Sequence, residues 1–380
     1  MGTEIRVLKG LEGVYVTESS ISFIDTEQGA LYYAGYDIRD LVERGRYEDV
    51  VFLLLNQRLA TAEEYHEHVR NLISNMRLTS EHIDTIKRHA GRIDPLSLLA
   101  ILMTMESSGQ VGGNHKDTSA AVRAVARMGA FLATILRVRI GGDYVPPRSD
   151  QGYAENMLYM MWGRPPSSEE ASVLDDLLVL HAEHGIPAST FACLVAASTL
   201  SDLASSVAAG ILALKGPLHG GASEASYKQA LEIGDPKKVP EWVEETLQGK
   251  RRIMGFGHRV YKAYDPRAII VKELIRRFQN RLSDEARMIY KVNLALEEYG
   301  EARLSQRGIY PNIDLWTPIL YRSLGFPESA FTPLFAVSRT AGWTAHILEY
   351  WRDNRLIRPL HRYVGETGKK YVPPELRKNL

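Results

Sequence analysis

The stretch STFACLVAASTLSDLASSVAAGILAL, residues 189–214, is apolar or small at nearly every position, and its only charged side chain is Asp202. A helix without a charged stripe is usually buried inside a large bundle. We therefore expect residues 189–214 to form a helix at the centre of a large helical protein. The chain's single cysteine, Cys193, lies in this stretch and is interpreted as a small apolar residue packed in the core.

Helical patterns continue on both sides of this stretch. Thr61 and Glu64 form a capping box, and Asp94-Pro95 suits a helix start because proline fits the first helical position. Strand signals are confined to the first 35 residues, for example 13–16 and 20–24. Further helices are expected at 65–76, 96–105, 118–136, 153–162, 168–180, 224–231, 239–248, 266–279, 283–299, 315–323 and 331–350. We predict an all-α fold with minor N-terminal strands.

The composition is that of an ordinary soluble protein. The 380 residues include 46 basic and 46 acidic side chains, so the formal net charge is zero. Proteins that bind nucleic acid through phosphates are normally basic, so this class is disfavoured. The N-terminal residues lack the apolar core of a signal peptide, and apolar stretches such as 207–214 are too short to span a bilayer. We expect a cytoplasmic protein with no nucleic-acid or membrane partner.

His219 lies in the segment GPLHGG, residues 216–221. Pro217 discourages the preceding helix from continuing, and Gly220 and Gly221 permit a tight turn. His219 is therefore expected at a junction between two helices, where backbone N–H groups point outward. It could share a proton with a ligand there, or it could be a turn histidine satisfied by the backbone.

His258 lies in GFGHRVY, residues 255–261, after a basic run at 250–252 and before Lys262. The Gly-x-Gly spacing alone is a weak nucleotide-binding signal because no convincing strand precedes it. A glycine-rich basic loop could hold phosphate groups, and a solvated run of charges is an equally good interpretation.

Asp314 follows a loop and precedes a predicted helix, so it could simply be a helix N-cap. If Ile313, Leu315 and Trp316 instead enclose the carboxylate, the loss of water would raise its pKa. Asp314 would then be a better general base near neutral pH.

His181 and His184 are three residues apart, a spacing that can bind zinc from one helix face. Together with Asp314 they would form the ligands of a metal-dependent hydrolase, an alternative of a different class. No His-Glu-x-x-His motif is present, which leaves the metal signal weak. His66 and His68 lie in a polar helical stretch and are expected on the surface.

Arg267, Arg339 and Arg358 each lie among apolar or small residues, where an unpaired charge would be unfavourable. Guanidinium groups bind carboxylates through two parallel hydrogen bonds, so three of them would suit a substrate with two carboxylates. The alternative is that each arginine forms an internal salt bridge.

Taken together, these segments resemble the citrate synthase family. The resemblance rests on residues 216–222, on GFGHRVY with Asp265-Pro266-Arg267, on Asn312-Ile313-Asp314, on Ser338-Arg339 and on Arg358-Pro359, in the order and spacing of that family. GLEGV at 10–14 and LYYAGYDI at 31–38 also look like its N-terminal region. The resemblance covers nearly the whole chain, whose length is similar to the shorter prokaryotic type.

The resemblance implies a homodimer of two-domain helical subunits. A large domain at 1–220 and 326–380 would form the dimer, and a small domain at 221–325 would close over the active site. The implied enzyme is an acyltransferase of the citrate (Si)-synthase type, which condenses oxaloacetate with acetyl-CoA and water to citrate and CoA at the entry to the tricarboxylic acid cycle. No metal and no tightly bound cofactor are expected, since the coenzyme A thioester is a substrate.

The resemblance also implies residue roles. Asp314 would remove a proton from the acetyl methyl, His219 would stabilise the enol or enolate, and His258 would polarise and protonate the ketone of oxaloacetate. Oxaloacetate would be bound by His184, His219, His258, Arg267, Arg339 and Arg358, the last supplied by the partner subunit. Coenzyme A would contact Arg251, Arg252, Ile253, Met254, Gly255, Lys262 and Arg307.

Two positions depart from the family pattern. Asp314 is followed by Leu-Trp-Thr-Pro, so Trp316 and Pro318 could reshape the acyl pocket. This leaves 2-methylcitrate synthase, which uses propionyl-CoA, as an alternative. Leu360 stands where a second basic residue is frequent, and Arg362 is a candidate substitute.

Overall fold

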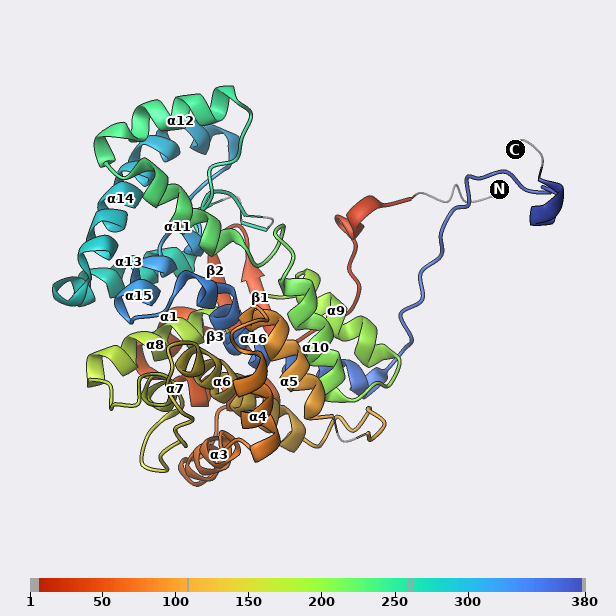
Figure 1. Cartoon of the computed structure of the whole chain (residues 1–380). Helices are drawn as coiled ribbons and strands as arrows, with labels where there is room; N and C mark the ends of the chain where they lie inside the picture. The colour runs from red at the N-terminus through yellow and green to blue at the C-terminus, as the bar shows by residue number, and fades with distance from the viewer. Residues whose placement is uncertain (1–6, 108, 259, 262, 378–380) are drawn as a thin grey trace.

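The computed structural model describes residues 7–107, 109–258, 260–261 and 263–377. It is built mainly of helices with one small antiparallel sheet near the N-terminus, which confirms the predicted fold class (Figure 1). The sheet has the order β1-β2-β3, with β1 at Ser22–Asp25, β2 at Ala30–Tyr33 and β3 at Tyr36–Asp37. The strand predicted at 13–16 is wrong, because this segment pairs with no strand of the described chain and Tyr15 is 98% exposed.

Sixteen α-helices account for most of the described chain. They are α1 Ile38–Arg44, α2 Tyr47–Asn56, α3 Ala62–Asn75, α4 Ser80–His89, α5 Pro95–Met105, α6 Ser119–Arg139, α7 Tyr153–Trp162, α8 Ser168–His181, α9 Ala188–Ser198, α10 Leu203–Leu214, α11 Ala222–Ile233, α12 Val239–Gln248, α13 Pro266–Phe278, α14 Asp284–Leu304, α15 Thr317–Ser323 and α16 Phe331–Tyr350.

The predicted helix starts are confirmed where a capping side chain marks them. Thr61 Oγ1 accepts from the Glu64 N–H at 3.3 Å, and Glu64 Oε2 accepts from the Thr61 N–H at 2.9 Å, which is the expected capping box at α3. Asp94 caps α5 through the Ser97 N–H. The short helices α1, α2 and α4 were not predicted.

Residues 189–214 form two helices, α9 and α10, where one was predicted. Leu200 adopts a left-handed backbone with φ of 63°, which ends α9, and Asp202 then caps α10 through the Ser205 N–H. The two helices pack against each other. They are also less enclosed than expected, since Val195 on α9 and Leu212 on α10 are exposed by 38% and 56% in the single chain.

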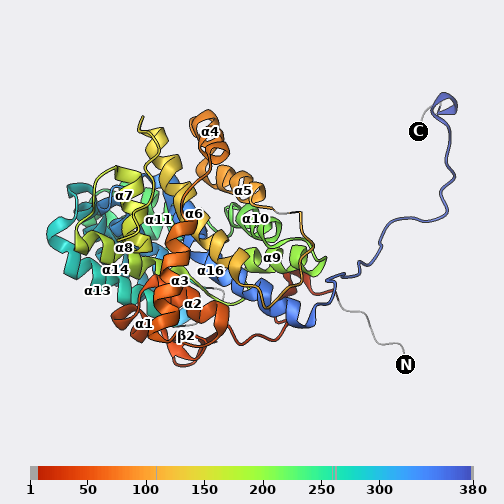
Figure 2. The same cartoon turned by 90° about the horizontal axis from the view of Figure 1, so that it is seen from below.

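The centre of the fold is α16 instead. Nearly all of its residues are buried, and it contacts α2, α5, α6, α8, α9 and α10 (Figure 2). α6 is long and apolar enough to cross a membrane by length and composition, which was not expected from the sequence, but most of it is buried within this bundle. Burial of that kind is typical of a core helix, so α6 is weak evidence for a membrane span.

Helices α11–α15 form a group of their own beside the main bundle (Figure 1). They pack mainly on one another, and α11 and α13 also contact α16 and α8 of the bundle. The segments at both ends of the chain leave the helical body on the same side (Figures 1 and 2). The candidate site lies where α11 and α13 meet α8 and α16.

Candidate active site

His219 lies in the turn between α10 and α11, as predicted. Its N–H donates to the Gly216 carbonyl at 2.9 Å. A Cβ atom at Gly220 would lie 2.3 Å from the Leu214 carbonyl oxygen, so only glycine permits the chain to fold back this tightly. Burial, with a contribution from the charge of Arg339, lowers the pKa of His219 to about 4. The imidazole is therefore neutral at physiological pH.

The hydrogen bonds of Ser189 favour one tautomer of His219. Ser189 Oγ lies 2.8 Å from His219 Nε2 and 3.3 Å from Trp343 Nε1. The indole N–H can only donate, so the serine hydroxyl accepts from Trp343, and its own proton is available to donate to His219 Nε2. In that arrangement the ring proton of His219 is on Nδ1, which can act as a hydrogen-bond donor to a ligand.

Asp314 lies in a short 3₁₀ turn, Ile313–Leu315, and is not its cap. Asn312 caps this turn, with its Oδ1 accepting from the Asp314 N–H at 3.0 Å. The Ser223 hydroxyl donates to Asp314 Oδ1 at 2.5 Å. Burial outweighs this hydrogen bond and raises the pKa of Asp314 above its ordinary value. The interpretation of Asp314 as a base is thereby favoured over that of an N-cap.

The pocket around Asp314 differs from the expectation at Trp316. Trp316 is fully buried, lies against Tyr290 of α14 and has the Lys272 ammonium 4.9 Å from its ring. These contacts lie inside the α11–α15 group and hold the ring of Trp316 against α13 and α14.

His258 is held in a single tautomer by the backbone. Its Nδ1 accepts from the Val260 N–H at 3.0 Å and from the Tyr261 N–H at 3.1 Å. Two donors on Nδ1 require the ring proton to be on Nε2. Burial, followed by the charge of Arg267, lowers the pKa of His258 to about 4. His258 is therefore a neutral ring with Nε2–H as its donor.

The loops that carry His258 and Asp314 are bonded to each other. The Gly257 N–H donates to the Tyr310 carbonyl at 2.8 Å, and the Asn312 N–H donates to the Gly255 carbonyl at 2.9 Å. The Asn312 side chain also donates to the Gly257 carbonyl at 2.8 Å. His258 and Asp314 are consequently parts of one paired segment, although 56 positions separate their numbers (314 minus 258).

His184 lies beside His258, as predicted for two residues that share a ligand. Their ring centroids are 5.0 Å apart, and His184 Nε2 is 3.3 Å from the Tyr261 hydroxyl. Burial and then the charge of Arg267 hold the pKa of His184 well below its ordinary value. His184 is therefore neutral as well.

Two of the predicted arginines lie near these histidines and differ in their partners. Arg267 forms a buried bidentate pair with Asp265, at 2.8 Å and 3.1 Å, so the internal salt bridge considered for it is present. Arg339 is 1% exposed, donates from Nε to the His181 carbonyl at 2.8 Å and lies over the ring of Phe335. Among the described residues no carboxylate is within ion-pair distance of Arg339, and burial lowers its pKa to about 10.

Arg358 is not brought to the site within one chain. It is exposed and lies in the C-terminal segment that follows α16 and leaves the helical body (Figure 1).

The predicted coenzyme A residues lie near the loop of His258. Arg251, Arg252 and Arg307 are exposed, whereas Ile253 and Gly255 are buried. Lys262 falls outside the described residues. Gln229 on α11 holds Met254 by both backbone groups: its Oε1 accepts from the Met254 N–H at 2.8 Å, and its Nε2 donates to the carbonyl at 3.2 Å.

Sequence reasoning missed three polar residues that orient this site: Ser189, Ser223 and Gln229. Each is a common residue in a helical stretch, and no local motif marks it. Their partners lie between 25 and 91 positions away in the chain, so only the fold reveals them.

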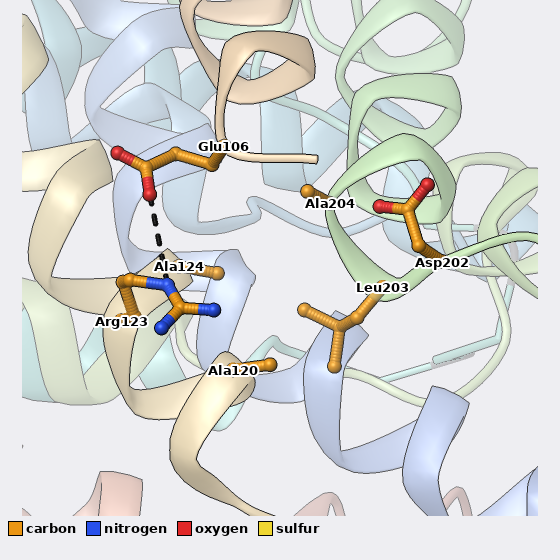
Figure 3. A pocket seen from close by; sticks show the side chains of 7 residues that line it. All are labelled: Glu106, Ala120, Arg123, Ala124, Asp202, Leu203 and Ala204. Carbon is orange, nitrogen blue, oxygen red and sulfur yellow. Dashed lines mark ion pairs between the residues drawn. The ribbon is translucent and has the colours of Figure 1, made fainter. Parts of the chain in front are cut away.

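A second group of charged side chains lies elsewhere, where the end of α5 meets α4 and α6, and Figure 3 shows two of its members, Glu106 and Arg123. Glu106 is 2.8 Å from Arg127 Nε, 3.6 Å from Arg123 Nε and 3.4 Å from His82 Nε2. We call these four residues the Glu106 cluster. A hollow of about 30 Å³ beside it has room for about one water molecule.

The metal-dependent hydrolase is not supported. In the part of the chain that the structure describes, no three His, Cys, Asp or Glu side chains are placed to hold a metal ion. His181 Nδ1 is also occupied, since it donates to the Leu177 carbonyl at 2.8 Å. His181, His184 and Asp314 therefore do not form a ligand set.

Comparisons with known proteins agree with this geometry. Residues 10–360 match the family model described as citrate synthase, C-terminal domain. The chain is 42% identical to citrate synthase of Saccharolobus solfataricus over 98% of this chain and 99% of the relative. It is 37% identical to 2-methylcitrate synthase 2 of Corynebacterium glutamicum over 99% of each.

A solved structure gives the same result. It is the ternary complex of carboxymethyl coenzyme A and oxaloacetate with citrate synthase from Thermoplasma acidophilum, which matches with a TM-score of 0.93 and 36% identity over 98% of this chain and 100% of the other. Similarity of this extent along the whole length establishes the family. The chain belongs to the citrate synthase family of acyltransferases.

Proposed function

We propose that the chain condenses oxaloacetate with acetyl-CoA and hydrolyses the resulting citryl thioester to citrate and CoA, at the entry to the tricarboxylic acid cycle in the cytoplasm. The names of its relatives and the two ligands of the Thermoplasma acidophilum complex support this assignment. The observation that carries it is the arrangement of hydrogen-bond partners around the histidines and Asp314. Two neutral histidines each keep one ring N–H for a ligand, and a carboxylate with a raised pKa lies on a paired loop beside them.

Asp314 and His219 are proposed as the pair that makes the enol. A thioester methyl is too weak an acid for a carboxylate in water, so charge must be stabilised at the thioester oxygen while the proton leaves. His219 Nδ1–H would donate to that oxygen, and Asp314 would remove the proton. Ser223, four positions after His219, hydrogen-bonds Asp314 and so connects the two groups.

Oxaloacetate would be held by His184, His258, Arg267 and Arg339. Nε2–H of His258 would polarise the ketone and then give its proton to the new hydroxyl. Arg339 is the stronger candidate for a substrate carboxylate because it is a buried cation with no counter-ion among the described residues, a state that an anionic ligand would relieve. Arg267 shares its charge with Asp265, so it would contribute through the guanidinium edge that Asp265 leaves free.

The active unit is proposed to be a homodimer in which Arg358 of the partner subunit completes the carboxylate site. The exposed apolar side chains of α5, α9 and α10, Ile101, Val195 and Leu212, support a covered face on these helices. The exposed C-terminal segment that carries Arg358 supports an arm that reaches another subunit. The small domain at 221–325 would close on the large domain and exclude water.

No tightly bound cofactor is proposed, because coenzyme A enters as the thioester substrate and leaves as the free thiol. Its phosphates would meet the exposed side chains of Arg251, Arg252 and Arg307 and the loop backbone at 253–255, with Lys262 as a further candidate.

The acyl group is tested by measuring CoA thiol release with oxaloacetate and either acetyl-CoA or propionyl-CoA. We expect release that depends on oxaloacetate and a higher kcat/KM for acetyl-CoA, since the ring of Trp316 is already engaged by Tyr290 of α14 and Lys272 of α13. A higher kcat/KM for propionyl-CoA would identify a 2-methylcitrate synthase, and thiol release that is independent of oxaloacetate would contradict both assignments.

A further inference from the structure

Glu183, directly before His184, is a buried carboxylate to which the proposed reaction gives no role. Its side chain has no exposed surface. Oε1 accepts from the Gly185 N–H, from the Ser22 hydroxyl at 2.9 Å and from His346 Nε2 at 2.9 Å. These donors belong to the turn itself, to β1 and to α16. One carboxylate oxygen therefore joins three parts of the fold at the residue next to His184.

The turn that carries His184 is also held through its backbone. The Tyr33 hydroxyl of β2 lies 2.9 Å from the Glu183 carbonyl oxygen and accepts from the Glu183 N–H at 3.2 Å. The Gly342 N–H donates to the Ala182 carbonyl at 3.1 Å. A Cβ atom at Gly342 would lie 2.2 Å from Glu183 Oε2, so α16 can approach this closely only at a glycine.

One face of α16 makes a series of contacts with this turn. Arg339 donates to the His181 carbonyl, Gly342 to the Ala182 carbonyl and His346 to the Glu183 carboxylate. Positions 339, 342 and 346 are three and four residues apart, the spacing that places side chains on one helix face. These three hydrogen bonds hold α16, which carries Arg339, in a fixed position against the turn that carries His184.

His346 balances the charge of Glu183. Its side chain is 2% exposed, and its other nitrogen, Nδ1, faces Glu349 at 3.9 Å and Ser19 Oγ at 3.5 Å. Burial opposes the charged ring, but Glu183 outweighs it and raises the pKa of His346. Burial likewise opposes the charged carboxylate, but His346 and then Arg339 hold the pKa of Glu183 below its ordinary value. Both directions favour an imidazolium beside a carboxylate, a pair whose net charge is near zero.

We propose that Glu183 and His346 are positioning residues for oxaloacetate. Together they fix the His184 turn against α16, and the charge of His346 cancels the field of Glu183 at Arg339. Without that cancellation, the negative charge of Glu183 would compete with the substrate carboxylates for Arg339. The proposal rests on the proposed function, because it assigns these residues to the binding of that substrate.

The test compares His346→Gln with the double variant Glu183→Gln/His346→Gln. The single change leaves a buried negative charge, so we expect the KM for oxaloacetate to rise by about tenfold and the KM for acetyl-CoA to stay within about twofold. The double change leaves two neutral amides, so the KM for oxaloacetate should return to within about threefold of the original value. His82→Gln in the Glu106 cluster is the matched control, because it removes another buried histidine beside a glutamate and should leave both KM values unchanged.

An unchanged KM for oxaloacetate in His346→Gln would overturn the proposal. A double variant as impaired as the single one would also overturn it, because that result would indicate a packing role only.

If His346→Gln does not fold, the unsubstituted chain provides the test. The groups that face His346 are Glu183, Glu349 and, along α16, Arg339. Deprotonation of His346 at alkaline pH should raise the KM for oxaloacetate selectively, and the double variant, which lacks this group, should not show the rise; the same pH dependence in both proteins would contradict the proposal. Absence of any oxaloacetate-dependent thiol release would instead reject the proposed function itself.

Discussion

His184 and Arg339 lie on or beside long helices of the main bundle, whereas His258 and Asp314 lie in short loops of the α11–α15 group. The first two are fixed by contacts between α8, α16 and the N-terminal sheet. The second two are fixed chiefly by hydrogen bonds between their own loops, through Asn312 and Gly257.

This difference indicates a division of labour. A binding site for two carboxylates needs charges at fixed positions, which buried helices provide. A base and an acid that act on two substrates must come together around them, and two loops that are bonded to each other can move as one unit. We therefore expect the bundle side to determine the affinity for oxaloacetate and the loop side to determine the rate of the chemistry.

Replacement of Asp314 by Asn should have the largest effect. Asn keeps the shape but cannot accept the methyl proton, so kcat should fall by about a thousandfold. Steady-state thiol release measures this change. Asp202→Asn, which keeps a capping side chain on α10, is the control and should stay within about twofold of the unsubstituted kcat.

Replacement of Arg339 by Gln should have the next largest effect and should act on binding. It removes the buried cation without a counter-ion, so the KM for oxaloacetate should rise by about a hundredfold, with a smaller change in kcat. Kinetics at varied oxaloacetate would show the split. Arg123→Gln in the Glu106 cluster should leave this KM unchanged; a fall in kcat alone for Arg339→Gln would contradict the division.

Removal of the Ser189 hydroxyl should have a moderate effect. His219 would lose the donor that places its ring proton on Nδ1, so Ser189→Ala should lower kcat by about tenfold. The KM for oxaloacetate should change little. Ser206→Ala removes another buried hydroxyl, on α10, and should leave kcat unchanged; equal losses in the two variants would point to packing alone.

The smallest effect on catalysis is expected at His68, which is buried against Phe52 outside the site and was wrongly predicted to lie on the surface. Burial lowers its pKa to about 4, so between about pH 6.5 and 4 the unfolded chain binds a proton that the folded chain does not. This contribution weakens stability as pH falls, by about 2 kcal/mol at pH 5. His68→Leu should make the loss of thermal stability between pH 7 and pH 5 smaller. An unchanged pH dependence in thermal denaturation would show that His68 is protonated when folded.

Local patterns were sufficient for most of the helices. Thr61 with Glu64, Asp94 with Pro95 and the glycines around His219 act through neighbours within a few positions, so their consequences are readable from the sequence. The break inside 189–214 was not readable, because it depends on a left-handed Leu200 that no glycine marks. The exposure of Val195 on α9 and Leu212 on α10 could not be predicted either, because exposed and buried faces of these helices have the same apolar residue types.

The functional residues divide in the same way. His219, His258 and Asp314 were predicted from motifs in the order of the family, and His184 was predicted from its matching position. Other polar residues of the site were missed because their hydrogen-bond partners are distant in the chain. They are Ser189, Ser223, Gln229 and the Glu183–His346 pair. The buried packing of Trp316 also depends on α13 and α14, which supply its neighbours Lys272 and Tyr290.

The division between binding and chemistry is tested most directly by titrating oxaloacetate into Asp314→Asn in a calorimeter. We predict a dissociation constant within about threefold of that of the unsubstituted chain, although this variant turns over about a thousandfold more slowly. Loss of oxaloacetate binding together with turnover would contradict the division, because Asp314 would then belong to the binding side of the site.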